Sequence, residues 1–170
     1  MTDEIVNRIA KSKLVTIDLE ELFPKGGRLV FDISKWLYEG LILKEKDFRD
    51  SIKQQTWQNY KDSYIAISCS TDAIIPSWAY LLVSSNLTPY AKTVVVGDLN
   101  LLETVIFTKI IDNLDISFYK NKSVIIKGCA NKPIPNTAYT ALVQKLQPFV
   151  KSIMYGEACS TVPIYKNKKA

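Results

Sequence analysis

Three cysteines and two carboxylates follow apolar segments of the sequence, and these residue types could bind a metal. Thiolates are soft donors that suit zinc or an iron–sulfur cluster, and a carboxylate oxygen can complete a four-coordinate site. The common C-x-x-C spacing is absent, so separate segments of the chain would have to supply the ligands. We therefore state a metal site as a hypothesis, with the ligand set Cys69, Cys129, Cys159, Glu157 and Asp98.

Two other interpretations of the cysteines remain open. Free cysteines are among the residues most often buried, so all three fit the core of a non-catalytic binding or structural protein. Cys69 also precedes a predicted helix start, where N–H groups and the helix dipole lower the pKa of a thiol, as a thiol-dependent enzyme requires. The chain contains no histidine. This excludes Ser-His-Asp and Cys-His catalysis, so a base would have to be Asp, Glu, Lys or Tyr.

The carboxylates behind the apolar segments have different predicted roles. Asp98 directly precedes a predicted helix and is expected to cap it. Glu157 precedes no predicted helix, so capping does not explain it and it is the better candidate for an acid–base or ligand role. Asp32 precedes a predicted helical turn, and we expect it to cap that turn.

An internal repeat places Asp98 opposite Glu157, and Cys69 opposite Cys129 once one loop residue is dropped. At a shift of 59 positions, eight of the 24 residues from 75 to 98 are identical to their counterparts. Unrelated sequences would share roughly one or two. The repeated segments, 64–98 and 123–157, each contain an apolar strand, a loop, a helix that begins near a proline, and a second strand. The sequence therefore predicts a duplicated β-loop-α-β unit.

The N-terminal part of the chain is predicted to add a hairpin. Residues 14–19 and 28–33 have the pattern of strands, and Pro24 with the glycine pair at 26–27 forms a turn signal between them. Further helices are predicted over 2–11, over 34–53 with a break near Gly40, and over 99–113. The residues after Glu157 are predicted to form a short extended tail.

The alternation of strands and helices predicts the fold class. We expect one α/β domain over residues 1–170 with a largely parallel sheet, because strand–helix–strand units make right-handed crossovers. The carboxyl ends of parallel strands share one edge, where ligands bind. The cysteines and carboxylates would then converge at that edge.

Composition limits the function classes further. The chain has 170 residues, 47% of them hydrophobic and 23% charged, which is typical of a globular protein. No apolar run reaches the 18 or so residues of a membrane span, and no signal-peptide core is seen, so we predict a cytoplasmic protein without a membrane partner. The net charge of +5 is scattered, which argues against nucleic-acid binding. Homo-oligomerisation remains open, and the identity of a small-molecule ligand is unknown.

Four segments carry a family resemblance: VFDISKWLYEGLILKEKDFR, CSTDAIIPSWAYLL, KGCANKPIPNTAY and KSIMYGEACSTVPIYK. They resemble the bacterial proteins grouped as domain of unknown function family 2480. The resemblance covers nearly the whole chain and implies a cytoplasmic bacterial protein of about this length. It implies no activity, substrate or catalytic residue, so the function stays unknown at this point.

Overall fold

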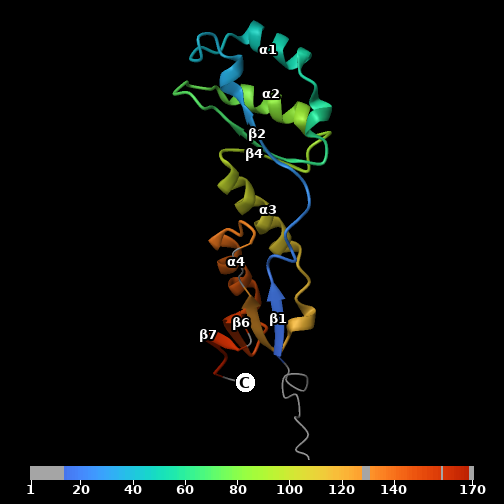
Figure 1. Ribbon diagram of the computed structural model, residues 1–170, viewed down its shortest axis with the longest axis vertical. Helices are drawn as coiled ribbons and strands as arrows, with labels where there is room; N and C mark the ends of the chain where they lie inside the picture. Colours follow the sequence, from blue (N-terminus) through green and yellow to red (C-terminus); the bar gives the residue numbers. More distant parts are fainter. Residues whose placement is uncertain (1–13, 128–130, 158, 169–170) are drawn as a thin grey trace, which may run out of the picture. The chain divides into compact units, whose positions relative to one another are not determined.

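The computed structural model describes residues 14–127, 131–157 and 159–168, which divide into two compact units (Figure 1). Unit 2 is the continuous segment 24–106. Unit 1 takes the residues before it and after it, so the boundary between the units falls within helix α3 (Leu99–Asn113). The helix predicted over residues 2–11 lies outside the described residues.

Each unit contains one mostly parallel sheet. The order is β2-β3-β4 in unit 2, where all pairs are parallel, and β1-β5-β6-β7 in unit 1, where only β7 is antiparallel. The α/β class with largely parallel strands is confirmed, but the strands form two sheets instead of one. The strands are β1 (Leu14–Asp18), β2 (Arg28–Asp32), β3 (Tyr64–Ser68), β4 (Thr93–Val96), β5 (Ser123–Lys127), β6 (Ser152–Glu157) and β7 (Ser160–Lys166).

The predicted N-terminal hairpin is wrong. β1 pairs with β5 in unit 1, and β2 pairs with β3 in unit 2, both in parallel. β5 and β3 are apolar and almost fully buried. Pairing with them therefore gives β1 and β2, respectively, more apolar contact than a two-stranded hairpin would. The proline–glycine turn signal between β1 and β2 marks the chain's passage from one unit to the other.

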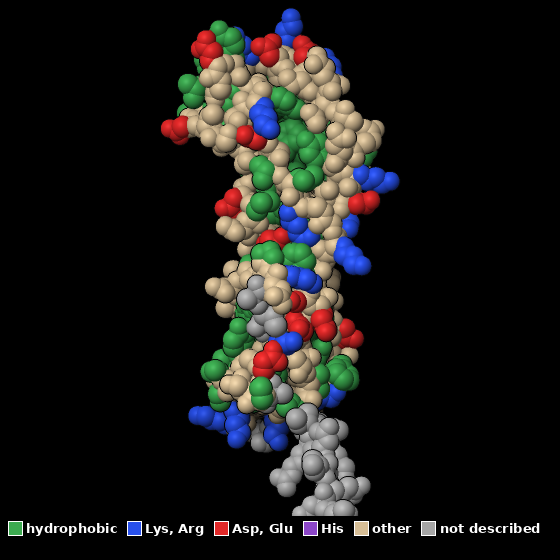
Figure 2. Space-filling view, in the orientation of Figure 1, with side chains coloured by type: hydrophobic (Ala, Val, Ile, Leu, Met, Phe, Trp, Pro, Cys, Tyr) green, Lys and Arg blue, Asp and Glu red, His purple; other side chains and the backbone are tan. Residues whose placement is uncertain are grey.

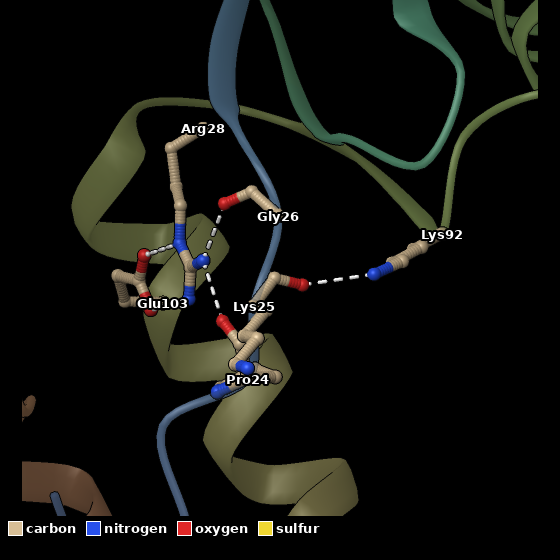
Figure 3. Close-up of polar contacts among 6 residues, drawn as sticks. All are labelled: Pro24, Lys25, Gly26, Arg28, Lys92 and Glu103. Atoms are coloured by element: carbon tan, nitrogen blue, oxygen red, sulfur yellow. Dashed lines mark hydrogen bonds and ion pairs between the residues drawn. The ribbon is translucent and has the colours of Figure 1, made fainter.

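The start of β2 is held by a partly buried ion pair (Figure 3). Arg28 Nε donates to Glu103 Oε1 of α3 at 2.7 Å, and the two side chains are only 15% and 9% exposed. Arg28 Nη1 also donates to the carbonyl oxygens of Pro24 and Gly26, each at 2.8 Å. The Lys92 ammonium donates to the carbonyl oxygen of Lys25 at 2.8 Å. These contacts fix the segment that enters β2.

The two sheets use the same strand registers. β3 and β4 pair from Tyr64 with Thr93, and β5 and β6 pair from Ser123 with Ser152, so both partners differ by 59 positions. The first residues of β2 and β1 pair with the first residues of β3 and β5 respectively. β1, β5 and β6 therefore correspond to β2, β3 and β4.

The helices follow the apolar periodicity of the sequence. α2 (Ser77–Leu87) and α4 (Asn136–Leu146) each follow an extended proline that serves as N-cap, and each buries residues four apart on one face. The predicted helix over 34–53 is interrupted, since Glu39 and Gly40 have positive φ angles of 50° and 72°. It forms a 3₁₀ turn (Ile33–Trp36) and then α1 (Glu45–Gln54).

No helix within the described ranges is long and apolar enough to cross a membrane.

Candidate functional site

The carboxyl edge of the unit 2 sheet is organised around Asp32, at the end of β2. Asp32 Oδ1 accepts hydrogen bonds from the backbone N–H groups of Ser34 at 3.0 Å and Ser70 at 3.1 Å. Ser70 Oγ donates to Asp32 Oδ2 at 2.6 Å and lies 2.8 Å from Ser34 Oγ. Asp32 is thus the N-cap of the 3₁₀ turn, as predicted, and it also ties the loop after β3 to the end of β2.

The protonation of Asp32 does not suit it to be a base. Burial raises the pKa of its carboxyl, but the hydrogen bonds from Ser70 and Ser34 outweigh that effect and lower the pKa to about 2. A general base works best when its pKa lies near the operating pH. At neutral pH Asp32 is therefore a fixed hydrogen-bond acceptor that holds two loops together.

Cys69 follows β3 and is half-buried. Its thiol donates to the Thr71 carbonyl oxygen at 3.4 Å, and its Sγ lies 3.4 Å from Thr71 Oγ1. Burial raises the pKa of Tyr80, and the charge of Cys69 raises it further. Tyr80 is therefore protonated at neutral pH and is not suited to be the base for this thiol.

The carboxyl edge of the unit 1 sheet contains ion pairs. Lys127 Nζ, at the end of β5, lies 3.4 Å from Asp18 Oδ2 and 3.6 Å from Glu157 Oε1. Glu20 Oε1 accepts a hydrogen bond from the backbone N–H of Asn131 at 3.0 Å. Glu157, which capping did not explain, therefore faces an ammonium group on the neighbouring strand.

The predicted metal ligands are divided between the units. Cys69 and Asp98 belong to unit 2, whereas Glu157 and Cys159 belong to unit 1. Cys129 lies outside the described residues, so the complete ligand set stays a prediction. Across residues 14–127, 131–157 and 159–168, no three Cys, Asp or Glu side chains are grouped to hold a metal ion.

The structure shows the surroundings of two predicted ligands, Asp98 and Cys159. Asp98 Oδ1 accepts a hydrogen bond from the Leu101 N–H at 2.8 Å, which confirms that Asp98 caps α3. Cys159 is exposed, so the interpretation of all three cysteines as buried core residues is wrong. Cys159 lies in the turn between β6 and β7, outside the core.

Unit 1 contains an apolar groove that the sequence did not indicate. It has a volume of about 390 Å³ and lies between α4 and strands β5, β6 and β7. The rings of Tyr139 and Tyr155 meet edge to face, with 5.8 Å between their centroids and 80° between their planes. Among the described residues the lining side chains are uncharged: Ile126, Tyr139, Thr140, Val143, Gln144, Tyr155 and Ile164.

The groove was missed because β7 was predicted to be a tail. Val162 and Ile164 alternate with other residues in the closing segment, a pattern that is typical of a strand. This signal is short, and Pro163 between them weakens it. Tyr139 is partly buried against the core of unit 1 and also lines the groove.

A second, polar cavity of about 170 Å³ lies beside Asp32 in unit 2. Gln55 Nε2 donates to the Tyr60 hydroxyl at 3.3 Å within its lining, and burial raises the pKa of Tyr60. The cavity is too small for most small-molecule ligands, whose sites enclose about 300 Å³ or more.

A comparison with protein families assigns the chain. The family model described as "Protein of unknown function (DUF2480)" matches residues 3–167. The chain belongs to this family. The resemblance carried by the four sequence segments is thereby confirmed. No curated protein and no solved structure matches the chain. Because the DUF2480 family is described without an activity, function has to be argued from the geometry of the two units.

Proposed function

We propose that this DUF2480 protein is a non-catalytic binding protein whose groove in unit 1 holds an uncharged, largely apolar small molecule. The groove itself is the observation that supports this proposal. Its volume of about 390 Å³ falls within the range of small-molecule sites, which are mostly apolar with a few polar groups.

The lining of the groove indicates the chemistry of the ligand. The perpendicular Tyr139 and Tyr155 rings offer a face and an edge to a flat aromatic group. Thr140 and Gln144 of α4 supply polar atoms that can orient a ligand hydroxyl or carbonyl. A charged ligand is disfavoured, because a charge placed against the described lining residues would find no opposite charge among them.

The polar clusters support a binding role over a catalytic one. Asp32 has a pKa far below neutral, and Tyr80, next to Cys69, remains protonated. Neither can remove a proton efficiently at neutral pH.

Binding of the neutral fluorescent probe N-phenyl-1-naphthylamine to the full chain tests the proposal. Ile164→Ser removes an apolar side chain from the groove and is expected to weaken binding about tenfold, since burying such a side chain contributes about 1.5 kcal/mol or more. Val162→Ser is the matched control. Val162 also lies on β7 and is 60% exposed, against 51% for Ile164, but it does not line the groove.

Two results would overturn the proposal. One is that N-phenyl-1-naphthylamine does not bind the wild-type chain. The other is equal binding by the Ile164→Ser and Val162→Ser variants, which would place the probe elsewhere.

We further propose that the two units derive from a duplicated β-loop-α-β unit in a cytoplasmic protein. The identical residues at a shift of 59, the matching strand registers and the matching buried positions of α2 and α4 support the duplication. The cysteine-based zinc or iron–sulfur site stays a prediction. Elemental analysis of the purified full chain tests it: about one metal per chain that is lost in Cys129→Ser supports the site, and metal-free protein removes it.

A further inference from the structure

β4 is an edge strand whose counterpart in unit 1 is covered. β6 pairs antiparallel with β7 along the side away from β5. In unit 2 the sheet ends at β4, and no strand in the described part of the chain pairs with its outer side. An uncovered edge presents backbone N–H and C=O groups that pair readily with another strand.

The backbone groups of β4 that point away from β3 belong to residues whose counterparts in β6 pair with β7. The Gly97 N–H donates to the Ile67 carbonyl of β3 at 2.9 Å, so Gly97 faces inward. Backbone groups of alternate residues point to opposite sides of a strand, which directs those of Val94 and Val96 outward. The corresponding residues of β6 are two of those that pair with β7.

Apolar side chains surround the carboxyl end of this edge. Val96 is 47% exposed, and Leu99 and Leu101, in the first turn of α3, are exposed as well. Leu81 is exposed on α2, the helix that packs against β4. Hydrophobic side chains reach the surface in both units (Figure 2). In unit 1 the counterparts of Val96 and Leu81 line the groove beside β7, so the corresponding surface there has a covering strand.

We propose that two copies of this chain associate through β4, so that their three-stranded sheets join into one continuous sheet. A two-fold axis through Val95 makes the two strands antiparallel, as β7 is to β6. This register sets Val94 of each copy opposite Val96 of the other. Lys92 and Asp98 flank β4, so the same axis brings the cation at one end of each strand near the anion at the end of the other, and opposite charges across strands stabilise a sheet.

Pairing with Asp98 requires Lys92 to turn outward, because its Nζ donates to the Lys25 carbonyl and lies 5.6 Å from the centroid of the Tyr64 ring on β3. Lys92 carries three N–H donors, of which one is directed to the Lys25 carbonyl. Asp98 accepts the Leu101 N–H through Oδ1, and its carboxylate has a second oxygen.

The other edge of the sheet, β2, is not an equivalent candidate. Its counterpart β1 pairs only with β5 among the described strands, so neither unit shows a strand added at that place. β2 instead provides a matched control, because Val30 is a valine on an edge strand of the same sheet with 50% exposure.

Sedimentation of the full chain at concentrations up to about 0.5 mM tests the proposal. We expect a monomer–dimer equilibrium for the wild type. Val96→Lys, which places a charge on the edge, is expected to raise the dimer dissociation constant at least about tenfold, whereas Val30→Lys changes it less than about twofold. Urea unfolding of each variant verifies that it folds. A wild-type chain that stays monomeric, or two lysine variants that dimerise alike, would overturn the proposal.

A disulfide test checks the register directly. In a chain with its three native cysteines replaced by serine, Val95→Cys brings two thiols together at the two-fold axis. Directly opposed, non-hydrogen-bonded residues have Cα atoms about 4.5 Å apart, within the reach of a disulfide. Mild oxidation is expected to cross-link this variant and to leave Val30→Cys in the same background monomeric. Equal cross-linking of both variants, or none in Val95→Cys, contradicts the register.

Discussion

Units 1 and 2 have the same strand registers, yet the carboxyl edges of their sheets hold different chemistry. In unit 1, Lys127 lies between Asp18 and Glu157. In unit 2, the position of Lys127 is occupied by Ser68, and Asp32 is bound by hydroxyl and amide groups. The matching strand registers determine the positions of the side chains at each edge. Single residues then decide whether an edge is held by ion pairs or by neutral donors.

The second difference concerns the strands β4 and β6. β7 covers β6 and forms one wall of the apolar groove, whereas β4 is uncovered among the described residues. The proposed ligand site and the proposed self-association surface therefore occupy corresponding places in the two units.

Removing the ion pair of Arg28 is expected to have the largest effect and to act on unit 2. Its counterpart position in unit 1 holds Leu14, so unit 1 has no such pair there. Glu103→Ala leaves the guanidinium partly buried without its carboxylate and should lower the free energy of unfolding by about 3 kcal/mol. Urea unfolding measures the loss, and hydrogen exchange should place it in β2 and β3.

Glu45→Ala is the control for that variant. The Glu45–Arg49 pair on α1 is exposed, so its loss should cost about 0.5 kcal/mol or less. Equal losses from the two variants would show that burial does not distinguish the pairs.

Corresponding glycines compare the covered strand with the uncovered one. Gly97 and Gly156 have φ angles of 149° and 122°. A Cβ on Gly156 would lie 2.6 Å from the Ser160 carbonyl oxygen of β7, whereas one on Gly97 would meet the movable end of Leu101. We expect Gly156→Ala to cost about 3 kcal/mol and Gly97→Ala about 1 to 2 kcal/mol, measured by thermal unfolding. The reverse order would contradict the role of β7.

Exchanging the edge chemistry should have a smaller effect. Lys127→Met removes the ammonium between two carboxylates and is expected to cost about 1 kcal/mol at low salt. Ser68→Lys places an amine opposite Asp32 and should stabilise unit 2 by about 0.5 kcal/mol. Urea unfolding in low salt and in about 1 M NaCl measures both effects, which salt should reduce. Effects that do not change with salt would rule out ion pairing as their cause.

The smallest expected effect concerns the titration of Asp32. Its lowered pKa means that its stabilisation is present above the ordinary value of 3.8 and is lost as the pH falls through about 2. Ser70→Ala removes the hydrogen bond that lowers the pKa most, so the pKa should rise toward 3.8, and Ser34→Ala should raise it less. Carboxyl ¹³C NMR titration measures each value. An unchanged pKa in Ser70→Ala would refute this account.

Local features of the fold could be predicted from the sequence. The helix predicted over 99–113 agrees with α3, and prolines and apolar runs located α2, α4 and the strands of the repeat. The assignment of strands to sheets could not be predicted, because β1 pairs with a strand far along the chain. A proline–glycine turn is equally suited to a hairpin and to a connection between units.

In the candidate sites, too, local contacts could be predicted from the sequence and contacts between strands could not. Capping by Asp32 and Asp98 was predictable because each accepts an N–H two or three residues ahead. The contact of Glu157 with Lys127 depends on strand pairing, so the sequence did not reveal it. Helix α2 is apolar on most of its faces, so its sequence did not reveal that Leu81 is exposed while Ala79 and Val83 are buried.

The interrupted sequence of unit 1 has a consequence for the order of folding. Residues 24–106 supply every strand of unit 2, and Arg28 needs only to meet Tyr64. Leu14 must instead meet Ser123, after the whole of unit 2 has been synthesised. Contacts between residues distant in sequence form more slowly, and chains fold as they emerge from the ribosome. Unit 2 is therefore expected to fold first, and β1 is expected to pair with β5 only after β5 has been synthesised.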